Sequence, residues 1–191
     1  NGLKAYDKRH GYRGAIDNIV KNNWLSIVNE KYKLPANYIF ARVIGYEGSS
    51  LVVETSNSDK ELIKLENFKW AREFISNSYV GPKISSPEEI FNTFDIIYVS
   101  QNENKFILEQ IPKINGGIMV MDPYSGRVIA LSGGFDFKLS NFNRVFQAER
   151  QPGSAFKPFV YLSALENGLK PNSLILDAPF VVDQGENLGK W

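Results

Sequence analysis

Ser154 and Lys157 stand three positions apart in the stretch "QPGSAFKPFVYL". Ser154 follows a Pro-Gly pair, and Pro158 stands directly behind Lys157. Proline lacks an amide proton, so it is tolerated in the first turn of a helix and is costly further in. Pro158 therefore predicts a helix that begins close to Ser154. Residues three apart share one face of a helix, so the two side chains are expected on the same side.

This placement suits covalent chemistry at Ser154. Free backbone amides and the positive end of the dipole favour developing negative charge at a helix N-terminus. A serine hydroxyl is a weak nucleophile unless a base removes its proton, and a partly neutral lysine can act as that base. Ser154 is thus a candidate nucleophile and Lys157 its candidate base. The same residues also fit a plain N-cap serine and a surface lysine, and the spacing alone leaves both interpretations open.

The composition narrows the classes of function. The 191 residues include 22 basic and 21 acidic side chains, one histidine and no cysteine. A near-neutral chain has no broad phosphate-binding field, so we expect no nucleic-acid partner. Without cysteine there is no disulfide or thiol chemistry, and His10 alone cannot form a multi-histidine site, so we expect no metal and no cofactor. The apolar runs are far shorter than the roughly 20 residues of a membrane helix.

The first part of the chain is expected to lead into a small β-rich domain. Residues 1–14 are polar and basic and are expected to be solvated, and the apolar spacing over residues 16–32 favours a short amphipathic helix. Five segments rich in β-branched and aromatic residues follow, separated by turn residues. They read "YIFARVIGY", "LVVET", "ELIKL", "DIIYVS" and "KFILEQIP". Five short strands with alternating patterns favour a small closed barrel of the OB-like type.

A second unit is expected to begin near Lys113. The segments "GIMVM" and "RVIAL" flank the turn "DPYSG", which has proline early and glycine late, as a hairpin connection should. Their apolar residues are consecutive, so we expect this sheet to be covered on both faces. We therefore divide the chain into residues 1–24, 25–112 and 113–191. The predicted fold class is α+β and β-rich, with a five-stranded OB-like barrel in the middle part.

Longer stretches of the sequence resemble a known protein family. The string "FNRVFQAERQPGSAFKPFVYLSALENG" resembles the nucleophile region of the class A, bifunctional penicillin-binding proteins, with the 1A type most similar. "GGIMVMDPYSGRVIALSGG" resembles the hairpin before that nucleophile, and "YDKRHGYRG" resembles the segment after the family's glycosyltransferase domain. The resemblance implies that residues 1–24 are a linker from that domain. It also implies that residues 113–191 are the N-terminal part of a serine β-lactamase-like transpeptidase domain.

The resemblance implies an acyl-enzyme mechanism. Ser154 would be acylated by the D-Ala-D-Ala end of a peptidoglycan stem peptide or by a β-lactam, with Lys157 as its base. The family also needs Ser-x-Asn and Lys-Thr/Ser-Gly motifs after the nucleophile, and neither follows Ser154. The triplet Ser100-Gln101-Asn102 precedes the nucleophile and is interpreted as a turn between strands. We therefore expect this chain to be a piece of a longer enzyme and to be inactive alone.

The parent implied by the resemblance polymerises glycan strands and cross-links stem peptides at the periplasmic face of the bacterial inner membrane. Its anchor would lie in an N-terminal segment outside this sequence. Two alternatives remain at this point. The chain could be a non-catalytic module whose barrel docks an envelope protein, or a relative of the serine β-lactamases and DD-carboxypeptidases. The second alternative shares Ser-x-x-Lys but does not explain the barrel.

Overall fold

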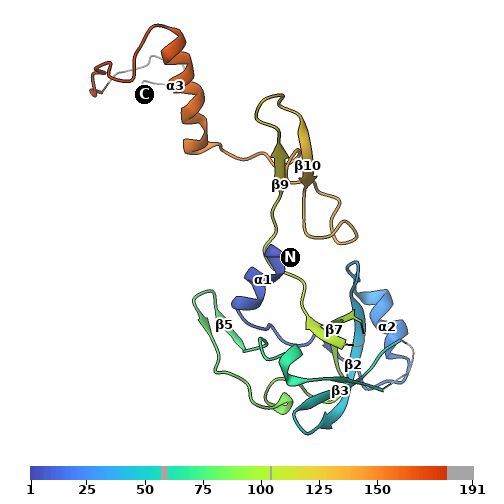
Figure 1. Ribbon diagram of the computed structural model, residues 1–191. Helices are drawn as coiled ribbons and strands as arrows, with labels where there is room; N and C mark the ends of the chain where they lie inside the picture. Colours follow the sequence, from blue (N-terminus) through green and yellow to red (C-terminus); the bar gives the residue numbers. More distant parts are fainter. Residues whose placement is uncertain (57–59, 104, 180–191) are drawn as a thin grey trace, which may run out of the picture. The chain divides into compact units, whose positions relative to one another are not determined.

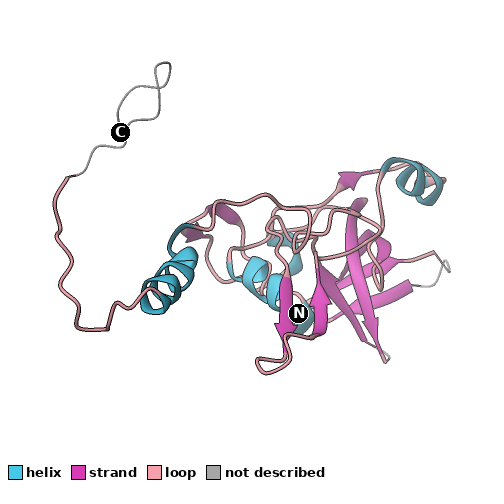
Figure 2. Cartoon of the chain, turned by 90° about the horizontal axis from the view of Figure 1, so that it is seen from above, coloured by secondary structure: helices cyan, strands magenta, loops and turns pink. Residues whose placement is uncertain are grey.

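The computed structural model describes residues 1–56, 60–103 and 105–179. The chain divides into two compact units, residues 1–148 and residues 149–191. The first unit contains the sheets (Figure 1). The helix of the second unit is drawn in cyan in Figure 2.

A six-stranded antiparallel sheet forms the centre of the first unit. Its strands run in the order β4-β3-β2-β7, and both β8 and the short β1 pair with β7. The bounds are β1 Asp17–Asn18, β2 Ile39–Glu47, β3 Ser50–Glu54, β4 Lys60–Ile63, β7 Asp95–Asn102 and β8 Lys105–Glu109. The five longer strands correspond to the five that the sequence predicts.

The sheet curls, but its outer strands β4 and β8 are not paired with each other within the described ranges. Where β4 and β8 come close to each other, the Asn67 side-chain amide donates to the Phe106 carbonyl oxygen over 3.0 Å. The β-rich, OB-like architecture is therefore confirmed. The expected full closure is wrong in this detail, because a side chain bridges the seam where a ladder was expected.

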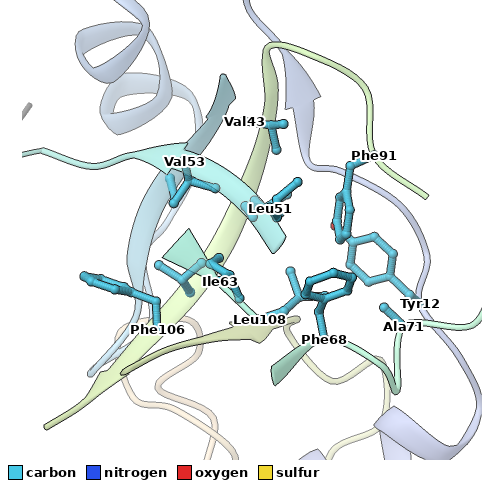
Figure 3. Packing of buried hydrophobic residues seen from close by; sticks show 13 residues of the cluster. Tyr12, Val43, Leu51, Val53, Ile63, Phe68, Ala71, Phe91, Phe106 and Leu108 are labelled. Carbon is cyan, nitrogen blue, oxygen red and sulfur yellow. The ribbon is translucent and has the colours of Figure 1, made fainter. Parts of the chain in front are cut away.

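Apolar side chains from the longer strands fill the inside of the curl. Figure 3 shows these side chains gathered, and the fully buried ones include Val43, Leu51, Val53, Ile63 and Leu108. The rings of Phe68 and Phe91 join this core with centroids 5.7 Å apart. In β3, buried residues alternate with partly exposed ones, as a strand with one face on a core should.

Helix α2 (Trp24–Lys31) covers the outer face of β2 and β7. Its Trp24 and Val28 pack with Phe40, Ile96 and Tyr98 of the strands. Because β7 therefore contacts apolar side chains on both faces, its first five residues are all buried. The alternation expected for the barrel strands fails there for this reason.

Residues 1–14, which were expected to be solvated, pack in part against the OB-like domain. Helix α1 (Gly2–Arg9) carries a buried carboxylate, Asp7, which bonds with residues about a hundred positions further along the chain. The helix expected over residues 16–32 forms only as α2, because Asp17 and Asn18 pair with β7. Partners distant in the sequence decide both differences.

Short elements connect β4 to β7. They are η1 (Leu65–Asn67), β5 (Phe74–Ser76), β6 (Tyr79–Val80) and η2 (Pro87–Glu89). At η2 the Glu89 carboxylate accepts from the Ser86 amide over 2.9 Å, which completes a capping box. The sequence Ser86-Pro87-Glu88-Glu89 thus forms a capped helical turn.

The hairpin of β9 (Ile118–Met121) and β10 (Val128–Ser132) forms a separate two-stranded sheet. Every residue of both strands is exposed, although the strands are apolar. Within the residues that the structure describes, no segment covers either face of this ribbon, so the expected covering layers stay a prediction for the longer protein. A two-stranded ribbon has no second layer of its own, so consecutive apolar residues here require other segments to cover them.

The second unit contains η3 (Gly153–Phe156), which continues directly into α3 (Lys157–Glu166). The described part of this unit ends at residue 179.

Candidate active site

The predicted helix start is confirmed at Ser154. Pro152 stands directly before the helical turn, and the Ala155 amide donates to its carbonyl oxygen over 3.1 Å. The Lys157 amide donates to the Ser154 carbonyl oxygen at the junction of η3 and α3. Pro158 lies in the first turn of α3, where its missing amide proton costs no helical hydrogen bond. The prolines thus fix the place of Ser154 at the start of the helix.

Ser154 and Lys157 are both exposed. Their spacing puts them one helical turn apart, within reach of a common substrate. Within the ranges that the structure describes, no hydrogen bond joins the Ser154 hydroxyl to the Lys157 amine. The arrangement offers a nucleophile and a nearby amine at a helix N-terminus. It does not show the direct contact of an activated pair.

The rest of α3 is apolar on most of its surface. Its side chains Phe159, Tyr161 and Leu162 are each more than half exposed. Phe156 and Phe159 contact each other with ring centroids 5.6 Å apart. A helix that is hydrophobic nearly all round is normally buried in a larger core. The sequence of α3 is therefore suited to contacts beyond those that the helix makes within its own unit.

The segment after the hairpin is held by Asn143, near the end of the first unit. Its side-chain oxygen accepts from the Val145 amide over 3.0 Å, and its carbonyl oxygen accepts from the Gln147 amide over 2.8 Å. A Cβ added to Gly133 would overlap the Asn143 side chain, so only glycine permits this close approach. Residues 143–147, which belong to the string quoted for the family resemblance, thus form a folded turn.

The triplet Ser100-Gln101-Asn102 lies at the end of β7, where it pairs with β8, so it belongs to strands more than to the turn. The Ser100 hydroxyl donates to the Glu109 carboxylate over 3.1 Å. Ser100 therefore serves the packing of the OB-like region.

The described residues contain neither a metal-binding cluster nor a membrane-spanning helix. No group of three or more histidine, aspartate or glutamate residues is placed to hold a metal ion within the described ranges. Within the same ranges, no helix has both the length and the apolar character needed to cross a membrane.

Sequence reasoning missed a buried ionic cluster around Asp7 and Glu109. Both carboxylates are nearly inaccessible and accept several hydrogen bonds each. One signal was present, since Glu109 follows "KFIL" in a strand whose neighbours are apolar. The partners of Glu109 could not have been inferred from the sequence, because Lys4 and Lys8 lie in α1, about a hundred residues away.

The comparison with protein families decides the relationship. Residues 12–114, more than half of the chain, match the family described as "Penicillin-binding protein OB-like domain". The chain belongs to the penicillin-binding proteins. Residues 116–191 match a second family, described as "Penicillin binding protein transpeptidase domain". The two matches meet between the OB-like sheet and the hairpin, and the predicted resemblance is confirmed.

Individual penicillin-binding proteins resemble the whole chain. "Penicillin-binding protein 1A" of Rickettsia felis is 38% identical over 192 residues, which cover 100% of this chain and 23% of the relative. The protein of the same name from Pseudomonas aeruginosa is 38% identical over 187 residues. This match covers 95% of this chain and 22% of the Pseudomonas protein. This chain therefore spans about a quarter of the length of these relatives.

A solved structure agrees with these matches. The crystal structure of penicillin-binding protein 1A from Haemophilus influenzae matches with a TM-score of 0.64 and 27% sequence identity. The match covers 100% of this chain and 27% of that one. The fold relationship therefore extends over both family regions.

Proposed function

We propose that this chain is part of a bacterial peptidoglycan synthase that cross-links stem peptides through an acyl-serine at Ser154. The observation that carries the proposal is the transpeptidase-family match over residues 116–191, within which Ser154 lies in η3, directly before α3. Lys157 lies one turn further along and supplies the base. The OB-like region and the relatives named penicillin-binding protein 1A support the same assignment.

The proposed reaction has two acyl transfers. The Ser154 oxygen attacks the carbonyl carbon of the D-Ala-D-Ala peptide bond, and Lys157 takes the hydroxyl proton. The carbon–nitrogen bond breaks, terminal D-Ala leaves with a proton, and an ester remains on Ser154. An amine of a neighbouring stem then attacks the ester carbonyl carbon, the bond between this carbon and the Ser154 oxygen breaks, and an amide cross-link forms. The proton that the amine loses passes to the Ser154 oxygen and restores its hydroxyl. A β-lactam follows the first step only, because its opened ring stays attached.

The wider assignment concerns the longer protein. We place residues 1–24 as the linker from a glycosyltransferase domain, residues 25–112 as the OB-like domain and residues 113–191 as the beginning of the transpeptidase domain. The longer protein is anchored in the inner membrane and faces the periplasm. The exposed apolar strands of the hairpin and the apolar surface of α3 support this division, because both suit the interior of a larger domain.

Cross-linking by the full-length protein tests this function. Supplied with a lipid-linked peptidoglycan precursor, the protein should form both glycan strands and cross-linked peptides. Ser154→Ala should abolish the cross-links and leave glycan polymerisation in place. Ser163→Ala, which changes an exposed serine of α3, is the matched control and should retain both activities. Cross-linking that survives Ser154→Ala would refute the assignment.

A further inference from the structure

The Asp7 carboxylate joins the first helix of the chain to the segment that leaves the OB-like domain. It accepts two hydrogen bonds from the Arg13 guanidinium, at 3.0 and 2.9 Å. It also accepts from the Gln110 side-chain amide over 2.7 Å and from the backbone amide of Lys113 over 3.0 Å. Asp7 is only 4% exposed. A buried carboxylate with four donors holds them in one fixed geometry.

A second carboxylate, Glu109, also connects α1 to the segment that leaves the OB-like domain. Here the acid lies on the outgoing segment and its partners lie on α1. It lies at the end of β8, and its oxygens accept from the ammonium groups of Lys8 at 2.9 Å and Lys4 at 3.5 Å, both on α1. Its side chain is 7% exposed, so solvent screens these ion pairs little. An acid of α1 therefore binds the outgoing segment, and an acid of the outgoing segment binds α1.

Tyr38 extends this cluster to the base of the hairpin. Its hydroxyl lies 3.4 Å from the Glu109 carboxylate, and burial, followed by the Glu109 charge, raises the pKa of Tyr38 above its ordinary value. Its ring meets the Phe135 ring, just after β10, at a centroid distance of 6.4 Å. Beside it, the Ala36 amide donates to the Asp136 carboxylate over 2.8 Å. The chain thus leaves the OB-like domain through a cluster that also contacts the residues directly after the hairpin.

We propose that Asp7 and Glu109 form a reciprocal latch that fixes the direction in which the β9–β10 hairpin leaves the OB-like domain. The latch consists of Asp7, Arg13, Gln110 and Lys113 on one side and of Lys4, Lys8 and Glu109 on the other. Both carboxylates are positioning residues, since neither is near Ser154 in the sequence and neither bonds with it. The inference rests on the proposed function only for its consequence, which is that the OB-like domain orients the beginning of the transpeptidase region.

The latch is distinct from the apolar core of the OB-like fold, although Glu109 also accepts a hydrogen bond from Ser100 of β7. The core inside the curled sheet consists of apolar residues of the strands and of the rings that join them. The polar atoms of the latch instead join α1 to the last residue of β8, Glu109, and to the residues that follow it. Removing one buried carboxylate leaves its cations unpaired, so the local junction should open first. The sheet should then keep its geometry.

Distances between two spin labels test the latch in this chain. The sequence has no cysteine, so introduced cysteines can be labelled without background. One pair, Ala5→Cys and Tyr124→Cys, spans α1 and the tip of the hairpin, and both positions are exposed. A second pair, Glu47→Cys and Gln101→Cys, spans exposed positions of β2 and β7 and reports on the sheet alone. Each pair is measured in the unchanged chain, in Asp7→Asn, in Glu109→Gln and in Asp17→Asn.

The latch predicts a narrow distance distribution for the Ala5–Tyr124 pair in the unchanged chain. Asp7→Asn and Glu109→Gln should each broaden it, and Asp17→Asn should not, because Asp17 pairs with Lys31 at the surface. The Glu47–Gln101 distribution should stay narrow in all four chains. A broad Ala5–Tyr124 distribution in the unchanged chain would overturn the proposal, as would a narrow one in both latch variants. Broadening of both pairs would also overturn it, since the carboxylates would then stabilise the whole domain. No arm depends on acylation, so this test and that of the proposed function fail independently.

Discussion

The buried Arg42 side chain joins the sheet of the OB-like domain to α2 and to the loop before it. It is 7% exposed, and its Nε donates to the Glu54 carboxylate over 2.5 Å. Its Nη1 donates to the carbonyl oxygen of Lys21 over 2.9 Å, in the loop before α2. The guanidinium also lies 5.6 Å from the centre of the Trp24 ring. A guanidinium has enough donors in a rigid fork to serve all of these partners, and a lysine does not.

Arg42→Met should therefore lower the free energy of unfolding by about 2–4 kcal/mol, because it leaves Glu54 and the loop carbonyls without their donor. Urea denaturation followed by tryptophan fluorescence measures the change. Lys31→Met is the control, since it removes a basic residue whose ion pair with Asp17 lies at the surface. Equal stability of the two variants would contradict the role given to Arg42.

Buried tyrosines make the OB-like domain sensitive to alkali. Burial raises the pKa of Tyr98 to about 12, with a smaller effect of Tyr32. Burial, followed by the charge of Asp95, raises the pKa of Tyr12 further. An unfolded tyrosine ionises near pH 10. These groups therefore stabilise the fold fully below about pH 10, and their contribution is lost as the pH rises toward the folded-state pKa.

Alkaline titration should show this loss as unfolding. The tyrosinate absorbance of the buried group should appear together with the loss of circular dichroism, and Tyr98→Phe should move the transition to higher pH. Tyr124→Phe, which changes an exposed ring, should not move it. Complete tyrosinate formation in a chain that keeps its circular dichroism would show that the phenols are accessible.

The helices and strands that depend on residues close by in the sequence were mostly predicted. The five longer strands and the helix start at Ser154 follow from local patterns and from proline. The structure differs where distant partners decide. Asp7 is buried because Gln110 and Lys113 lie beside it. Helix α2 is shorter than predicted because β1 pairs with β7. The same limit applies to Ser154, whose spacing to Lys157 was predictable and whose activation depends on contacts that a local pattern cannot supply.

The turn between α1 and β1 depends on Gly11. Its φ is +93°, and an added Cβ would lie 2.8 Å from the Arg72 carbonyl oxygen. Gly14 has almost the same φ, +92°, with nothing within 4 Å of its added Cβ. Gly14→Ala should cost about 1 kcal/mol for the left-handed backbone alone. Gly11→Ala should cost about 2–4 kcal/mol, because overpacking adds to that strain.

Thermal or urea unfolding of the two glycine variants separates these effects. The matched backbone angles make Gly14→Ala the control for strain, so the difference between the variants reports the close approach of Arg72. If both variants lose the same stability, the tight contact at Gly11 does not exist in solution.

At the scale of the whole molecule, we expect this chain alone to react poorly with β-lactams. Ser154 and Lys157 are both exposed, and no hydrogen bond joins their side chains within the described ranges. Catalytic groups need to be held to within a fraction of an ångström, which a transpeptidase achieves with several distant segments. Incubation with a fluorescent penicillin should label the full-length protein far faster than the 191-residue chain. Stoichiometric labelling of this chain at a similar rate would contradict the expectation.

We propose that Ser154 carries the acyl group in a penicillin-binding transpeptidase. The most direct test of this proposal is mass spectrometry of the full-length protein after incubation with benzylpenicillin, with peptide mapping of the adduct. We predict one penicilloyl group on the peptide that contains Ser154, no adduct in Ser154→Ala, and an unchanged adduct in Ser163→Ala. An adduct on another residue, or one that persists in Ser154→Ala, would contradict this assignment.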